Sequence, residues 1–142
     1  MSTVHITRTL SAPVDRVWSA LTDPEALMAW FWPQSLGPKV TADVRPGGRF
    51  RIDATSAGFA ATGVYREVSP PTRLVMTWQW DGDEMGDDAA ESVVTIELTA
   101  RGDDTDLDLR HERLTSDDER DKHAQGWNDC LDRLPGWLAQ SS

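Results

Sequence analysis

Hydrophobic and polar residues alternate along much of the chain, and this two-residue period predicts β-strands. In residues 73–80, for example, every second side chain is large and apolar. The predicted strands are residues 3–10, the two arms of a hairpin between 39 and 52 that turns at Pro46-Gly47-Gly48, and residues 61–68, 73–80, 92–99 and 105–113. Because short turns join successive segments, we expect an antiparallel meander, taken as a sheet of six strands.

Three- and four-residue spacing predicts two short helices directly after the first strand. An apolar stripe from Val14 to Leu21 follows Pro13, which suits a helix start because its missing N–H leaves no donor unpaired there. Asp23-Pro24 interrupts this pattern, and a shorter helix that reaches Trp30 follows.

The last helix has the strongest start signal in the chain. Ser116 and Glu119 have the spacing of a capping box, in which each side chain bonds the backbone N–H of the other residue. The apolar face of this helix consists of Ala124, Trp127, Leu131, Leu134 and Leu138. Pro135-Gly136 falls late in the pattern, and we expect it to kink the helix or end it early.

These elements predict an α+β fold in a single domain over residues 1–142. A sheet with one apolar face needs a cover, and the last helix is the only long amphipathic cover available. One helix cannot fill the concave side of a strongly twisted sheet. We therefore expect a hydrophobic pocket between the sheet and the helix.

Composition narrows the classes of partner. The protein is acidic, with 24 Asp and Glu against 14 Lys and Arg and a formal net charge of −10, so it would repel a nucleic-acid backbone. Its one cysteine, Cys130, excludes an intramolecular disulfide and a multi-cysteine zinc site. The first residues do not form a signal peptide and no apolar run is long enough for a membrane span, so we expect a cytoplasmic protein.

Motifs for catalysis, cofactors and metals are weak in this sequence. His5, His111 and His123 fall on different elements without ligand spacing, and no glycine-rich phosphate loop or nucleophile elbow is present. We therefore expect no metal, no cofactor and no committed catalytic residue. The chain is more readily interpreted as a binding protein than as an enzyme.

Four segments in register resemble one known superfamily. They are Ala12 to Pro24 followed by Trp30, then Pro46-Gly47-Gly48-Arg49-Phe50, then Gly63 to Val75 leading to Thr77-Trp78, and Gly126-Trp127 through Leu131 and Leu134. This pattern resembles the SRPBCC, or START-like, superfamily, and within it the homologues of the heat-shock-protein-90 ATPase activator. The resemblance implies a helix-grip (Bet v-like) fold, in which the antiparallel sheet wraps around a long C-terminal helix and encloses a hydrophobic cavity. Members include lipid and hormone carriers and polyketide aromatase/cyclases.

The candidate ligand-binding residues are those expected to converge on that cavity. They are Trp30, Phe31, Phe50, Ile52, Tyr65, Trp78, Trp80, Leu109, His111, Trp127, Leu131 and Leu134. His111 follows the inward parity of Leu107 and Leu109, so it either orients a ligand or is a buried histidine paired with a backbone carbonyl or a tyrosine. The strand parity leaves open whether Tyr65 or its neighbours Val64 and Val68 face inward.

Cys130 lies close to the buried side of the last helix. We interpret it as a small buried hydrophobe rather than a reactive thiol, because no basic residue is evidently placed to favour the thiolate.

The leading functional hypothesis is a protein that binds a small hydrophobic or aromatic molecule between sheet and helix. The first alternative is an interaction module that stimulates a chaperone ATPase. The second is an aromatase/cyclase-like enzyme that uses acid-base groups in the pocket. A chaperone or a second copy of the chain stays open as a protein partner.

Overall fold

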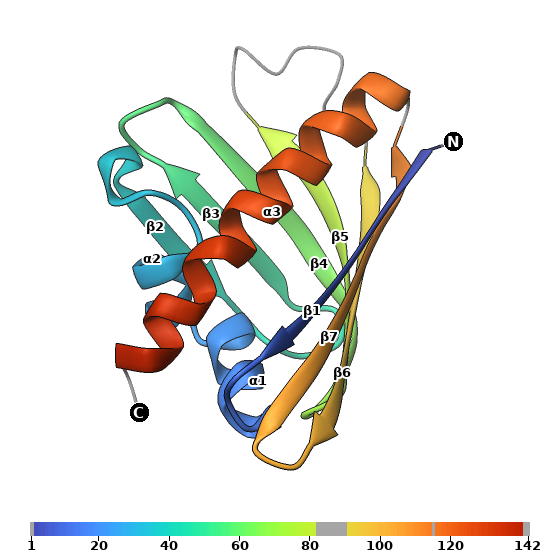
Figure 1. Ribbon diagram of the computed structural model, residues 1–142. Helices are drawn as coiled ribbons and strands as arrows, with labels where there is room; N and C mark the ends of the chain where they lie inside the picture. Colours follow the sequence, from blue (N-terminus) through green and yellow to red (C-terminus); the bar gives the residue numbers. More distant parts are fainter. Residues whose placement is uncertain (1, 82–90, 115, 141–142) are drawn as a thin grey trace.

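The alternating segments form one antiparallel sheet in the computed structural model, which describes residues 2–81, 91–114 and 116–140 (Figure 1). Its strand order is β1-β7-β6-β5-β4-β3-β2. The strands are β1 (Ser2–Leu10), β2 (Pro38–Ala42), β3 (Arg49–Ala54), β4 (Phe59–Ser69), β5 (Arg73–Asp81), β6 (Ser92–Arg101) and β7 (Asp104–Leu114). Each strand from β3 to β7 pairs antiparallel with the strand before it, so the meander is confirmed. β1 pairs with β7 and forms one edge of the sheet.

All seven predicted segments are strands of this sheet in the described residues, so the expected count of six was one too few. Both arms of the predicted hairpin are full members of the sheet, with β2 on the edge and β3 between β2 and β4. Val40 lies opposite Ile52 and both are buried, so the register keeps the apolar side of each arm on the same face as the rest of the sheet.

The predicted short helices are α1 (Val14–Thr22) and α2 (Pro24–Trp30), followed by the 3-10 turn η1 (Gln34–Leu36). Asp23 separates α1 from α2, and its Oδ1 accepts a hydrogen bond from the Glu25 N–H at 3.1 Å as the N-cap of α2. Trp30 Nε1 donates to the Ala20 carbonyl at 2.9 Å and so ties α2 to α1. This pairing satisfies the buried indole N–H and fixes where the chain leaves α2.

The terminal helix α3 (Asp117–Gln140) crosses one face of the curved sheet (Figure 1). Ser116 Oγ accepts from the Glu119 N–H at 3.2 Å, as the capping signal predicts. The expectation that the helix ends early at Pro135 was wrong, because α3 continues through that residue to Gln140. Leu134 and Leu138 on either side of Pro135 are both buried, and this packing offsets the lost backbone hydrogen bond.

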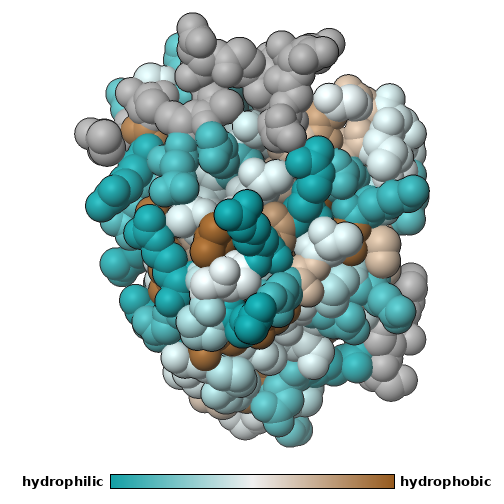
Figure 2. Space-filling view, turned by 180° about the vertical axis from the view of Figure 1, so that it is seen from behind, coloured by the Kyte–Doolittle hydropathy of each residue, from teal (hydrophilic) through white to brown (hydrophobic). Residues whose placement is uncertain are grey.

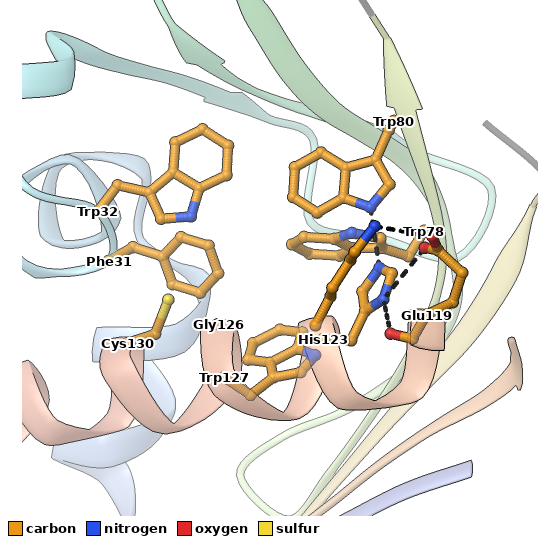
Figure 3. A pocket seen from close by; sticks show the side chains of 10 residues that line it. Phe31, Trp32, Trp78, Trp80, Glu119, His123, Gly126, Trp127 and Cys130 are labelled. Carbon is orange, nitrogen blue, oxygen red and sulfur yellow. Dashed lines mark hydrogen bonds and ion pairs between the residues drawn. The ribbon is translucent and has the colours of Figure 1, made fainter. Parts of the chain in front are cut away.

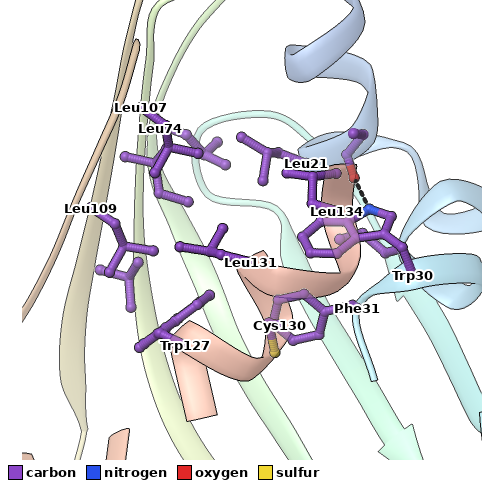
Figure 4. Close-up of a cluster of buried hydrophobic side chains, with 14 of the residues drawn as sticks. Leu21, Trp30, Phe31, Leu74, Leu107, Leu109, Trp127, Cys130, Leu131 and Leu134 are labelled. Atoms are coloured by element: carbon purple, nitrogen blue, oxygen red, sulfur yellow. Dashed lines mark hydrogen bonds between the residues drawn. The ribbon is translucent and has the colours of Figure 1, made fainter. Parts of the chain in front are cut away.

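A dense aliphatic core lies under the C-terminal half of α3 (Figure 4). Leu131 and Leu134 are 1% and 0% exposed. They pack among buried leucines from β5, β7 and α1, namely Leu74, Leu107, Leu109 and Leu21. This half of the sheet–helix interface is therefore filled.

The face of the molecule opposite α3 is mainly hydrophilic (Figure 2). Outward side chains of β1, β5, β6 and β7 interact across neighbouring strands. His5 is hydrogen-bonded to Asp108 at 2.9 Å, and Arg73 forms an ion pair with Glu97 at 3.2 Å. The sheet thus directs its apolar side chains toward α3. No helix within the described ranges is long and apolar enough to cross a membrane.

Candidate functional site

An open pocket of about 330 Å³ lies beside the N-terminal half of α3, where β5 and the segment after α2 approach it (Figure 3). We call it the tryptophan pocket. It is lined by Phe31, Trp32, Trp78, Trp80, Glu119, Lys122, His123, Gly126, Trp127 and Cys130. This volume is within the range of small-molecule sites, near its lower end.

Local periodicity explains how β5 and α3 supply the walls. Trp78 and Trp80 are two residues apart on β5 and so point to the same side of the sheet. His123, Gly126, Trp127 and Cys130 follow helical three- and four-residue spacing on α3. The Trp32 and Trp80 rings are within 10° of parallel with their centroids 6.1 Å apart, so the pocket has flat aromatic walls.

Arg133 holds in place the third wall of the pocket, which consists of Phe31 and Trp32. Its Nη2 donates to the Phe31 carbonyl at 2.7 Å and its Nε donates to the Trp30 carbonyl at 3.2 Å. These carbonyls belong to the end of α2, where orphan acceptors need a partner. A guanidinium from α3 therefore fixes the segment that supplies Phe31 and Trp32.

His123 forms the polar edge of the tryptophan pocket. Its Nε2 accepts from Trp80 Nε1–H at 2.9 Å, so the ring proton is on Nδ1, which donates to the Glu119 carbonyl at 2.7 Å. The Glu119 carboxylate lies 3.8 Å from the same ring (Figure 3). His123 thus joins the first turns of α3 to β5.

His111 is fully buried below the pocket, and both of its ring nitrogens are paired. Nδ1 accepts from Trp127 Nε1–H at 3.0 Å, and Nε2 lies 2.6 Å from Ser92 Oγ, which donates to the Trp78 carbonyl at 3.0 Å. Burial, with a smaller effect from the nearby His123, lowers the pKa of His111 to about 3. The ring is therefore neutral at pH 7, with its one proton directed at Ser92.

This pairing corrects the expected partners of His111. They are Trp127 and Ser92 rather than a backbone carbonyl or a tyrosine. In this arrangement His111 has no free lone pair or proton to offer a ligand, and it fixes the Trp127 indole in the pocket wall.

The predicted site residues fall into three groups. Phe31, Trp78, Trp80 and Trp127 line the tryptophan pocket. A gap of about 30 Å³ deeper in the core is lined by Phe31, Phe50, Ile52, Tyr65, Trp78 and Trp127 among others. Trp30, Leu109, His111, Leu131 and Leu134 are buried and line neither space.

Sequence reasoning missed the polar rim and part of the wall. Trp32, Glu119, Lys122, His123 and Gly126 line the pocket but were not candidates. The capping box held the missing signal, since a helix that starts there places residue 123 one turn after Glu119 and one turn before Trp127.

Tyr65 and Cys130 are both buried. Tyr65 is 2% exposed while Val64 and Val68 are only partly buried, so the tyrosine faces inward, and burial raises its pKa to about 12. Burial also raises the pKa of Cys130 to about 12, although Arg133 Nη2 lies 3.7 Å from its Sγ. A basic residue is therefore near Cys130 after all, but the thiol stays protonated.

Two further features bear on what the site can bind. Within the described residues, Trp78 Nε1 is fully buried and has no hydrogen-bond partner. No group of three or more His, Cys, Asp or Glu side chains in the same ranges is placed to hold a metal ion.

Comparisons with known proteins agree on one family. Residues 11–139 match the family model described as activator of Hsp90 ATPase homolog 1-like protein. A comparison with curated proteins found no match.

Several solved structures are similar to this chain in fold. CalU16 from Micromonospora echinospora is 32% identical over 96% of this chain and 75% of its own, with a TM-score of 0.76. DynU16, a protein of the dynemicin biosynthetic locus, is 26% identical with a TM-score of 0.82, and the match covers 100% of this chain and 49% of DynU16. PFC0360w, an HSP90 activator from Plasmodium falciparum, shares the fold at 21% identity, with a TM-score of 0.78 over 98% of this chain and 97% of its own.

Proposed function

The chain belongs to the family of activator of Hsp90 ATPase homolog 1-like proteins, a branch of the SRPBCC superfamily with the helix-grip fold, and from this we propose that it binds a small hydrophobic or aromatic molecule in the tryptophan pocket. The family fits a ligand-binding or polyketide cyclase-like role. DynU16, a structural relative, comes from a biosynthetic locus, which is in keeping with a small-molecule guest.

The observation that carries this proposal is the open pocket of about 330 Å³, whose walls are four tryptophans and Phe31. Gly126 lies on α3 at the exposed edge of this pocket, where an added Cβ atom would meet no atom within 4 Å. A guest in this space gains about 25 cal/mol for each Å² of apolar surface that leaves water. The indole rings supply that apolar surface, and Glu119, Lys122 and His123 form a polar rim.

The test fills the pocket from within. Gly126→Leu should place its side chain in the tryptophan pocket and abolish binding of ligands found by native mass spectrometry or thermal shift in a set of fatty acids, polyketide-like aromatics and isoprenoids. Gly136→Leu is the matched control, because Gly136 lies on the same helix, also meets no atom within 4 Å of an added Cβ, and does not line the pocket. Equal binding by the two variants, or no ligand from any class, would contradict the proposal.

Stimulation of a chaperone ATPase is the second candidate, favoured by the family match and by the fold shared with PFC0360w. It predicts that the purified chain raises the ATPase rate of a heat-shock-protein-90 chaperone and that Gly126→Leu leaves this effect intact, since a surface contact does not need the pocket. No change in rate at saturating protein would exclude it.

An aromatase/cyclase-like activity has less support. The predicted acid-base residue, His111, does not line the pocket and has both nitrogens paired, so the acid or base would have to come from Glu119, Lys122 or His123 on the rim. We also propose that the protein acts in the cytoplasm. Its single cysteine is buried and free, so the fold needs no oxidising environment.

A further inference from the structure

Trp78 lies at the centre of the aromatic cluster and carries a donor without a partner in residues 2–81, 91–114 and 116–140. Its side chain is 4% exposed, and its ring lies 5.1 Å from that of Trp127 and 5.7 Å from that of Trp80, measured between centroids (Figure 3). The indole N–H can only donate, and among the described residues no acceptor is within its reach. A buried donor without a partner is unfavourable, so it needs an explanation.

Both imidazole acceptors near Trp78 are already used. His111 Nδ1 takes the proton of Trp127, and His123 Nε2 takes that of Trp80. The carbonyl of Trp78 itself accepts from Ser92. The indole N–H groups of Trp80 and Trp127 therefore have partners, whereas Trp78 Nε1 has none among the described residues.

Trp78 contacts two neighbouring spaces. It lines both the tryptophan pocket and the gap of about 30 Å³ deeper in the core. Trp78 Nε1 is buried, so a guest must shift the ring slightly to reach it. The deeper gap supplies room for that shift, and side-chain adjustments of this kind are common on binding.

We infer that the guest of the tryptophan pocket is a flat aromatic molecule of about two fused rings with one neutral hydrogen-bond acceptor on its edge, and that Trp78 Nε1 donates to this acceptor. The inference rests on the proposed function and specifies its ligand class. A pocket of about 330 Å³ is roughly twice the volume of a dry engineered cavity that holds one benzene ring. Aromatic walls of Trp32, Trp78, Trp80 and Trp127 favour an aromatic guest, which can stack on ring faces or meet their edges.

The test compares two probes of the same shape, quinoline and naphthalene, of which only quinoline has an acceptor nitrogen. Binding of each to the full chain is measured by calorimetry or ligand-observed NMR. Quinoline is the more water-soluble of the two, so the informative quantity is the ratio of the two Kd values in each variant. Trp78→Phe should weaken quinoline relative to naphthalene by about tenfold, since one hydrogen bond is lost in a buried site.

Trp80→Phe is the matched control. It makes the same change of ring size in the same wall, but the N–H that it removes is already bonded to His123. Both affinities should therefore fall by a similar factor, and the ratio should stay near that of the wild type. An unchanged ratio in Trp78→Phe, with both probes still binding, would overturn the role of Trp78 and leave the proposed function standing. Failure of both probes to bind the wild type would count against the proposed function itself.

NMR of the ¹⁵N-labelled wild type gives a second readout that needs no folded variant. On addition of quinoline the indole proton of Trp78 should move downfield and exchange more slowly with solvent, whereas naphthalene should change it much less. Equal responses to the two probes would indicate that a water molecule, not a guest, is the partner of Nε1, and the inference would fail.

Discussion

The two halves of the interface between α3 and the sheet are built on different principles. Under the C-terminal half, Leu131 and Leu134 pack with leucines from three other elements and line neither of the two spaces described above. Beside the N-terminal half, Trp78, Trp80 and Trp127 meet ring against ring, with Gly126 at the exposed edge, and about 330 Å³ remains open. Branched aliphatic side chains can fill irregular space, whereas large flat rings held by hydrogen bonds keep fixed positions around a gap.

The comparison also shows which half secures the fold. The aliphatic half contains many of the residues with almost no exposure, so it contributes much of the stability. In the aromatic half, hydrogen bonds from Trp127 to His111 and from Trp80 to His123 hold the rings in place. Stability and the open pocket are thus carried by separate parts of one helix.

Truncation in the filled half should have the largest effect. Leu134→Ala removes a side chain with 0% exposure from a close-packed site, so we expect it to lower the free energy of unfolding by about 2 to 5 kcal/mol. Chemical denaturation measures this directly. A loss below about 1 kcal/mol would mean that the aliphatic half is not the close-packed part of the interface.

The buried His111 should make stability depend on pH. Its pKa is lowered from 6.5 to about 3 in the folded chain, so below pH 6.5 the unfolded state binds a proton that the folded state does not. Stability should be complete above about pH 6.5 and fall as the pH decreases toward 3, by at most about 1.4 kcal/mol per pH unit.

His111→Gln isolates this effect, because Gln can accept from Trp127 and donate to Ser92 but does not titrate. Urea unfolding at pH 7, 6 and 5 should show a shallower loss for the variant than for the wild type. All other side chains are the same in both proteins. Parallel curves would show that His111 is not held neutral by its surroundings.

Arg133→Ala should separate the walls of the tryptophan pocket. It removes two charge-assisted hydrogen bonds to the Trp30 and Phe31 carbonyls in a partly buried place, and we expect a loss of about 1 to 2 kcal/mol in unfolding free energy. Ligand affinity should fall as well, since Phe31 and Trp32 lose their anchor. A variant that keeps full affinity for a pocket ligand would argue that the end of α2 is fixed without Arg133.

The smallest effect compares two glycines on the same helix. Gly126→Ala and Gly136→Ala should each raise the free energy of unfolding by up to about 1 kcal/mol, because alanine favours the helix and neither added Cβ meets an atom within 4 Å. Thermal unfolding measures both. If only Gly126→Ala destabilises, the space in the tryptophan pocket is closed in solution.

Periodicity in the sequence was sufficient for most of the fold. The alternation at residues 73–80 and the capping box at Ser116 and Glu119 located β5 and the start of α3, because these signals depend on local backbone geometry. The helix end was mispredicted at Pro135, where burial of Leu134 and Leu138 outweighs the local preference. The candidate site was found only in part. Helical spacing from the capping box places His123 on the face of Trp127, but Gly126 carries no pattern that marks it as a pocket residue.

The sequence by itself determined the antiparallel sheet, the terminal helix and which face of each turns inward, since these follow from the spacing of apolar residues along a short stretch of chain. Only the tertiary structure decided where the interface is filled and where it is open. That outcome depends on ring orientations and on hydrogen bonds between residues far apart in the chain, such as Trp127 with His111 and Trp80 with His123. Such pairs form only when the helix is seated on the sheet, and no local pattern of residues encodes them.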